Sequence, residues 1–307
     1  MNKLLFNSLL LLFILSCSEE ENTRMETFVT GAKIAGVNGI HFGPDGMLYA
    51  ASVIGSDISV VNTESKEIIK RYGIDKGVIG PDDVAFNSKG DFFWTSILTG
   101  EVAGFINGET KVIAGNPGIG VNPITFSDDD RLFVAQCFYD NGLFELDPNG
   151  IAKPRLILDN IGEFCGLNGM DWGPDGRLYG PRWFNNEIVS VNVDTGELRT
   201  EASGFNVPAA VKFNSKGELI VLDTGAGKVI KVKDGKNEEI AYVDQGLDNL
   251  ALNSKDEIFV SSSSLLHRSM TMLVSSSDRV VVVVVVVICC WTSREFFKAI
   301  SKLSSNE

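Results

Sequence analysis

Apolar and polar residues alternate in short runs over most of the chain, and residues that favour turns separate these runs. In one such stretch the alternation predicts strands over residues 83–86, 92–97, 101–106 and 110–114. The segments between them, NSKGD, LTG and NGE, each contain the Gly or Asn that tight reversals need. The pattern therefore predicts four short antiparallel strands that follow one another along the chain.

The same phrase of two strands and a turn occurs six times. The copies are VNGIHFGPDGMLYAAS from Val37, GPDDVAFNSKGDFFWTS from Gly80, VNPITFSDDDRLFVAQ from Val121, LNGMDWGPDGRLYGPR from Leu167, VPAAVKFNSKGELIVLD from Val207 and LDNLALNSKDEIFVSS from Leu247. Repeats of about 40 residues are typical of propeller blades, and such blades bury both faces only in a closed ring. The sequence therefore predicts an all-β fold, a six-bladed β-propeller of four-stranded antiparallel blades, over residues 27–290. A β-sandwich is the structural alternative, but it does not explain the period.

Each phrase opens with a polar or small residue at the start of its first strand. Because the innermost strands of a propeller begin at the same end of the central channel, these residues are expected to converge there. They are Asn38, Asp82, Asn122, Asn168, Ala209 and Asp248, with Asp83 and Asn249 adjacent. Converging carboxylate and amide oxygens suit a divalent cation, Ca²⁺ first and then Mg²⁺, Mn²⁺ or Zn²⁺. Alternatively, the Asn side chains satisfy backbone groups and the paired Asp residues form a solvated turn.

The motifs GPDG followed by LY, LNGMDWGPDGRLYG and LDNLALN resemble the gluconolactonase and paraoxonase-like propellers, the SMP-30 group, over about residues 27–262. The resemblance implies a channel cation that polarises a lactone or ester carbonyl. It matches Asn168 and Asn122 to metal ligands of that family, and the pair Asp248-Asn249 resembles the family's Asp-Asn pair one blade later.

This sequence also departs from the family pattern. Asn38 stands where the family has Glu, Ala209 where it has an acid, and Asp82 where paraoxonases have His.

Two functions follow as hypotheses. The first is a metal-dependent hydrolase of lactones or related esters, in which Asp82 is the catalytic base. Its metal ligands come from Asn38, Asn122, Asn168, Asp248 and Asn249. The alternative is a non-catalytic, membrane-tethered propeller that binds a sugar-derived ligand or a partner protein. The missing acid at Ala209 favours binding, whereas the NG and DN motifs favour the enzyme.

Polar residues also occur three positions after the opening residue of some phrases. His41 alternates away from its apolar neighbours, so it is expected between blades rather than in catalysis. Asp171 and Lys212 occupy the same place in later phrases, which favours a polar contact between blades.

Composition limits the classes of partner and metal site that the protein can have. The formal net charge of −13 would repel nucleic acid and anionic lipid headgroups. With only two His, a His-rich zinc site is excluded, and the spacing of the five Cys matches no paired zinc motif.

The N-terminus indicates export. A positive charge followed by a short apolar run over residues 1–16 predicts a signal peptide, too short for a membrane span. The run ends at Ile-Leu-Ser before Cys17, which resembles a bacterial lipobox, and residues 17–26 form a polar tether. We therefore expect a lipid-anchored protein of the bacterial cell envelope; an ordinary signal peptide with an incidental Cys is the alternative. Export also permits a disulfide between Cys137 and Cys165.

The C-terminal segment differs in composition from the repeats. No Gly follows Gly246, and eight consecutive Val run from Val280 to Val287. Residues 271–274 and 280–288 are expected to form a hairpin that completes the sixth blade, which is atypical from about 262. Alternatively the segment is an out-of-frame translation, and for residues 291–307 no structure is predicted.

The lipobox gives a first testable prediction. Replacement Cys17→Ala should move the protein from the membrane fraction to the soluble exported fraction, because no lipid can be attached. Cell fractionation with immunoblotting measures this. A wild-type protein that is already soluble and unlipidated would contradict the anchor.

Overall fold

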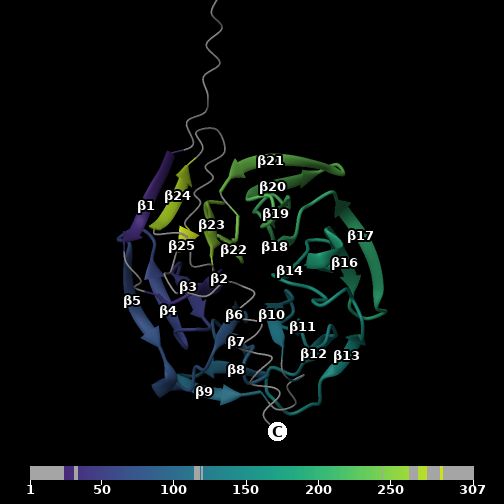
Figure 1. Ribbon diagram of the computed structural model, residues 1–307. Coiled ribbons are helices and arrows are strands. Elements are labelled where there is room, and N and C mark those ends of the chain that lie inside the picture. The colour runs from purple at the N-terminus through teal and green to yellow at the C-terminus, as the bar shows by residue number, and fades with distance from the viewer. Residues whose placement is uncertain are drawn as a thin grey trace, which may run out of the picture.

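Six short strands, one from each repeated phrase, surround the axis of the ring, which we call the channel (Figure 1). The computed structural model describes residues 24–30, 34–113, 118, 120–243, 245–262, 269–274 and 284–285, with only the backbone for 24–30, 269–274 and 284–285. The innermost strands are β2 (Val37–Phe42), β6 (Pro81–Phe86), β10 (Val121–Phe126), β14 (Asp171–Trp172), β18 (Pro208–Phe213) and β22 (Leu250–Leu252). Each contacts the next, and β22 contacts β2, so the ring is closed.

Five of the blades are four-stranded antiparallel sheets, which confirms the predicted propeller. Outward from the channel, the further strands of blade 1 are β3 (Leu48–Ser52), β4 (Asp57–Asn62) and β5 (Glu67–Tyr72), and those of blade 2 are β7 (Phe92–Ser96), β8 (Glu101–Ile106) and β9 (Glu109–Val112). Blade 3 adds β11 (Leu132–Gln136), β12 (Leu143–Leu146) and β13 (Arg155–Leu158), and blade 4 adds β15 (Leu178–Arg182), β16 (Glu187–Asn192) and β17 (Glu197–Ser203). Blade 5 adds β19 (Leu219–Asp223), β20 (Lys228–Lys233) and β21 (Lys236–Tyr242). The strands of blade 2 start and end within two residues of their predicted bounds.

The sixth blade differs from the others. Its strand β22 pairs with β23 (Ile258–Ser261), and β23 pairs in parallel with β25 (Val284–Val285). Strand β24 (Ser269–Val274) pairs antiparallel with β1 (Arg24–Thr30), and Figure 1 shows this ribbon at the rim of the ring beside β22 and β23. The N-terminal strand therefore pairs with the segment for which we expected a hairpin partner at 280–288. Cys17, residues 1–16 and residues 291–307 lie outside the described part of the chain.

The hydrophobic core lies between blades. In the described chain, six clusters of buried side chains form the core, and each cluster draws its members from two neighbouring blades. Between blades 1 and 2, for example, Tyr49 packs edge-on against Phe86 at 4.8 Å between ring centroids. Trp94 is 1% exposed in the same cluster. Each blade thus buries its apolar faces only because it has neighbours.

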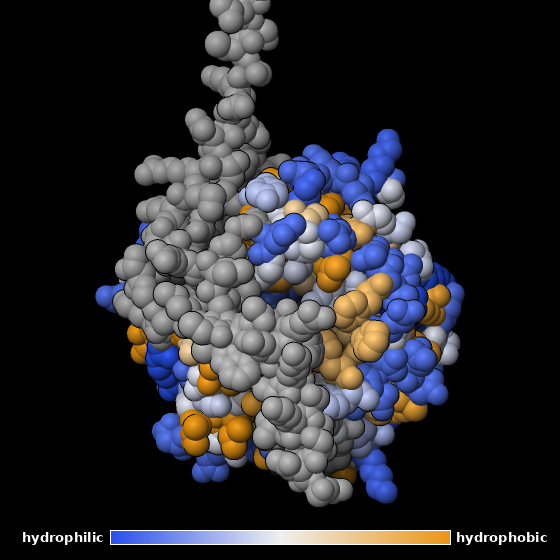
Figure 2. Space-filling model, in the orientation of Figure 1, coloured by the Kyte–Doolittle hydropathy of each residue, from blue (hydrophilic) through white to orange (hydrophobic). Residues whose placement is uncertain are grey.

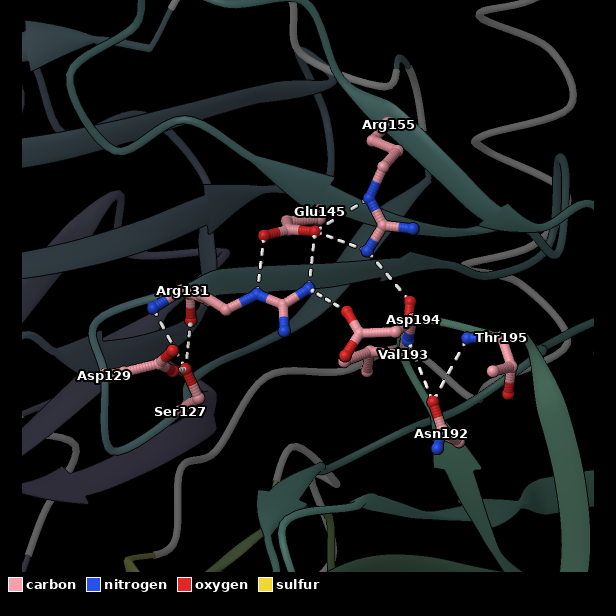
Figure 3. A network of polar contacts seen from close by, with 9 residues as sticks. All are labelled: Ser127, Asp129, Arg131, Glu145, Arg155, Asn192, Val193, Asp194 and Thr195. Atoms are coloured by element: carbon pink, nitrogen blue, oxygen red, sulfur yellow. Dashed lines mark hydrogen bonds and ion pairs between the residues drawn. The ribbon is translucent and has the colours of Figure 1, made fainter.

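Polar contacts add to this packing at the rim. Figure 3 shows Arg131 of blade 3 bound to Glu145 by two hydrogen bonds of 2.8 and 3.0 Å, while Arg155 binds the same carboxylate. Arg131 also reaches Asp194 in the β16–β17 turn of blade 4 at 2.9 Å. This network links two blades on their solvent side, where ion pairs add little stability individually but fix geometry when they form a network.

One disulfide joins Cys137, after β11, to Cys165, before the first strand of blade 4. The pairing that export was expected to permit is therefore present. The helices of the described chain are two single 3₁₀ turns, η1 (Ile74–Lys76) and η2 (Trp183–Asn185), and none of its helices has the length and apolarity to cross a membrane.

The glycine of each NG motif is required because the next blade lies very close to it. A Cβ atom at Gly39 would lie 2.5 Å from the Cα of Asp83, and one at Gly169 would lie 2.4 Å from the Cβ of Ala210. Both glycines follow the opening Asn of a phrase and face the inner strand of the next blade. Glycine therefore permits the close approach on which ring closure depends.

Replacement Gly169→Ala should consequently destabilise the fold by about 1–3 kcal/mol, the usual range for overpacking. The matched control is Gly73→Ala, because the nearest atom to its added Cβ would be a carboxylate oxygen of Asp75 at 3.4 Å. Denaturant unfolding of both variants measures the difference. Equal stabilities would contradict the steric account.

Candidate functional site

The starts of the inner strands bring polar side chains from blades 6, 1 and 2 together at one mouth of the channel. The amide Nδ2 of Asn38 donates to Oδ2 of Asp248 over 3.0 Å. The carboxylate of Asp82 is close enough to Asp248 and Asp83 for both charges to raise its pKa. The structure thus gathers three of the predicted residues, with Asp83 beside them.

The carboxylate of Asp83 accepts hydrogen bonds from its own blade and from two other blades. Its oxygens accept hydrogen bonds from Val84 N at 2.9 Å, from Asn249 Nδ2 at 3.1 Å and from Ile124 N at 3.3 Å. It therefore ties blade 2 to blades 3 and 6 across Gly39, whose missing side chain leaves the space. Burial raises the pKa of Asp83 to about 6, against the opposing charge of Lys212 and these hydrogen bonds.

Asp82 has a different environment although it is the adjacent residue. It is 4% exposed, and its side chain makes no hydrogen bond with any residue in the described chain. Burial is the main cause that raises its pKa well above the usual range, and the charges of Asp248 and Asp83 raise it further. A buried carboxyl whose pKa is raised in this way is a stronger base than an ordinary Asp carboxylate.

The four asparagines divide into two pairs. Asn38 accepts from Val53 N at 3.5 Å, and Asn249 accepts from Leu250 N at 2.8 Å, so both satisfy backbone groups. By contrast, the side chains of Asn122 and Asn168 form no hydrogen bond within the described residues, although Asn168 is only 5% exposed. Buried amides normally have partners, so these two remain available to a ligand.

A second polar layer lies three residues further along the inner strands. The Nζ of Lys212 donates to Met170 O over 2.8 Å and lies 3.6 Å from Oδ1 of Asp171, which confirms the predicted contact between blades. Burial, aided by the charge of Lys212, lowers the pKa of His41 to about 4. His41 is therefore neutral at physiological pH, and its Nδ1 lies 2.8 Å from Phe42 O.

Only some of the residues at this mouth suit a metal ion. Ala209 is fully buried and supplies no oxygen ligand from its side chain in blade 5. Among the residues with described side chains, no three His, Cys, Asp or Glu are arranged to hold a metal ion. The free amides of Asn122 and Asn168, with the carboxylate of Asp248, are nevertheless the oxygen donors that Ca²⁺ takes.

Sequence reasoning missed an aromatic group on the same face. Phe138 and Trp183 follow the second strands of blades 3 and 4, and these strands end beside the starts of β10 and β14. The signal was present in the repeat, because the residues after each second strand must lie at the same mouth. A groove of about 540 Å³ on the opposite face, lined by residues such as Phe42 and Lys255, holds no comparable group of buried carboxylates.

The environment of Asp82 predicts a pH-dependent effect on stability. The pKa of Asp82 is higher in the folded chain than in the unfolded chain, so its stabilising contribution is complete below the unfolded pKa, 3.8, and is lost as pH rises. In the presence of chelator, Asp82→Asn should therefore stabilise the fold at pH 8, because the neutral amide avoids the burial of a charge. It should have little effect at pH 3.5.

Thermal unfolding at both pH values measures this effect. The matched control is Asp128→Asn on the exposed turn after β10. Destabilisation by Asp82→Asn at both pH values would contradict the burial of an unpaired carboxyl.

Comparison with known proteins supports the fold. No known protein family and no curated protein matches the sequence. A gluconolactonase from Xanthomonas campestris has a similar structure, with a TM-score of 0.64 at 13% identity over 78% of this chain and 86% of that one. Virginiamycin B lyase from Staphylococcus aureus has a TM-score of 0.62 at 14% identity, over 89% of this chain and 90% of that one. A luciferin-regenerating enzyme has a TM-score of 0.61 at 16% identity, over 84% of this chain and 93% of that one. At these identities the likeness establishes that the chain shares the β-propeller fold of these proteins.

Proposed function

We propose that the protein is a metal-dependent hydrolase of lactones or related esters that works at the mouth of the channel. The observation that carries the proposal is the state of Asp82, a buried carboxyl without a hydrogen-bond partner in the described chain and with a raised pKa. Buried acids in such environments are concentrated at catalytic sites. The gluconolactonase with a similar fold is a second, weaker support.

The cation would be held by Asp248 with the amide oxygens of Asn38, Asn122 and Asn168. Ca²⁺ fits such a set of neutral and acidic oxygens best, with Mg²⁺, Mn²⁺ or Zn²⁺ as alternatives. Asn249 suits the role less, because its oxygen accepts from Leu250 N at 2.8 Å, whereas the contact of the Asn38 oxygen with Val53 N is long, at 3.5 Å. When bound, the cation would polarise the substrate carbonyl and lower the pKa of Asp82.

The chain itself supplies the proton chemistry. Asp82 takes a proton from the water whose oxygen bonds to the carbonyl carbon, and the ring C–O bond then breaks. The departing oxygen receives the proton, so a lactone yields a hydroxy acid and Asp82 is regenerated. Ala209 supplies no carboxylate for this role at the start of the inner strand of blade 5.

We also propose that this chemistry takes place outside the cytoplasm, at a membrane to which Cys17 attaches the propeller through lipid alone. The disulfide between Cys137 and Cys165 supports export, since such bonds persist in oxidising compartments. Nucleic acid is not an expected partner of a chain with a net charge of −13.

A non-catalytic binding propeller is the second candidate. The absence of an acid at Ala209 and the aromatic group around Trp183 favour it, because these features concern recognition rather than proton transfer. Both functions use the same mouth.

The test of hydrolysis is a panel of aliphatic and sugar lactones with the Ca²⁺-loaded protein. We expect turnover that chelator abolishes and that Asp82→Asn lowers by about a hundredfold or more, since a general base contributes about 10²–10⁴. Asp128→Asn is the control. Turnover that survives chelator or Asp82→Asn would contradict the assignment, and no turnover across the panel would leave the binding propeller.

A further inference from the structure

We infer that the face over blades 3 and 4 binds a neutral sugar ring, next to the channel mouth. This inference does not rest on the proposed hydrolysis, because it uses side chains outside the carboxylate group. It is carried by four features of one region: an exposed aromatic row, strained backbone, orphaned hydrogen-bond donors and position.

The aromatic row comes from three loops. Trp183 lies 5.9 Å from Phe138 and 5.2 Å from Phe184, and Phe184 lies 5.6 Å from Phe164, between ring centroids. Phe164 is 68% exposed and Phe184 is 43% exposed. Figure 2 shows apolar colour gathered on this face, over the region of blades 3 and 4 in Figure 1. Contiguous exposed rings of this kind mark ligand sites more often than chance exposure.

The backbone under the row is strained. Phe138 has φ of 73° and Phe164 has φ of 58°, a left-handed conformation that is unfavourable for a bulky residue. Phe138 N donates to Phe164 O, and each residue is next to a cysteine of the Cys137–Cys165 disulfide. The disulfide thus holds two loops in the conformation that presents both rings. Strain of this kind persists where surrounding structure enforces it, and it is concentrated at binding sites.

Two hydrogen-bond donors beside the row have no acceptor among the described residues. They are Nε1 of Trp183 and Nε of Arg182, and both atoms are buried. An unpaired buried donor destabilises the fold, and an incoming oxygen would relieve that cost. Arg182 meanwhile binds Glu187 through Nη1 at 2.6 Å, so its charge is already balanced. The site therefore offers N–H groups without net positive charge.

The row also lies next to the predicted ligand residues. Pro181 O accepts from Asn168 N at 3.2 Å, and Arg182 and Trp183 follow Pro181 directly. A ligand on the row is consequently a neighbour of the free amide of Asn168.

These features indicate which class of ligand the region binds. A pyranose ring has an apolar C–H face that stacks on aromatic rings and a rim of oxygens that accept from N–H groups. A hydrocarbon would leave both donors unpaired. An anion would meet a balanced Arg182 on a chain of net charge −13. A neutral sugar satisfies the rings and the donors together.

The experiment titrates neutral oligosaccharides (maltohexaose, cellohexaose, xylohexaose and mannohexaose) into the full chain by calorimetry, in the presence of chelator so that turnover plays no part. At least one should bind with Kd of about 1 mM or tighter. Trp183→Ala and Phe184→Ala should each weaken it about tenfold or more. Trp183→Phe, which keeps a ring but lacks the N–H, should fall between Trp183→Ala and wild type.

The matched control is Tyr242→Ala, another exposed aromatic residue, which lies on the outer strand β21 and is 58% exposed. Binding by this variant should equal that of the wild type. If Trp183→Ala does not fold, Phe184→Ala decides alone, because its side chain is largely at the surface. No binding of any neutral sugar, or binding that Phe184→Ala leaves unchanged, would overturn the inference; so would tighter binding of an apolar dye than of every sugar.

Discussion

The contact on which the channel mouth depends is that between Asp83 and its three donors. By binding Val84, Ile124 and Asn249, this carboxylate links blades 2, 3 and 6 across the glycine of blade 1. Ring closure thereby brings the acids of blades 6 and 2 close together. Burial is the main cause that raises the pKa of Asp82, and the like charges of Asp248 and Asp83 raise it further. We expect this arrangement to lower the stability of the fold at neutral pH.

Repetition made the fold predictable. Six copies of one phrase identify six inner strands, and equal positions in a repeat must lie at equal positions in the ring. The same logic places the opening residues at one mouth and the polar contact of Lys212 with Asp171 between blades. The repeat could not predict the pairing at the end of the chain. Strand β1 precedes the first repeated phrase, and nothing in the phrases indicates that β1 pairs with β24.

The hydrogen-bond partners of the side chains could not be predicted from the sequence, for a physical reason. Asn38 and Asn168 both stand before Gly in the same motif, yet Asn38 meets Asp248 while Asn168 meets no partner in the described chain. The difference lies in what the preceding blade contributes at the start of its inner strand, Asp248 for Asn38 and Asn122 for Asn168. Likewise, the strained loops of Phe138 and Phe164 come together only in the folded ring.

The two sides of the mouth thus have complementary chemistry. Blades 6 and 2 supply carboxylates and blade 1 supplies an amide, whereas blades 3 and 4 supply aromatic rings, free amides and N–H donors. A neutral ring with one electrophilic carbonyl would satisfy both sides, and the central requirement is then a cation that balances the acids.

Titration calorimetry with Ca²⁺ tests that requirement most directly. One Ca²⁺ should bind per chain, with an affinity that rises with pH because the cation competes with protons for the carboxylate oxygens at the mouth. The bound ion should raise the melting temperature. Absence of both heat and stabilisation with Ca²⁺, Mg²⁺, Mn²⁺ and Zn²⁺ would contradict a cation site at this mouth.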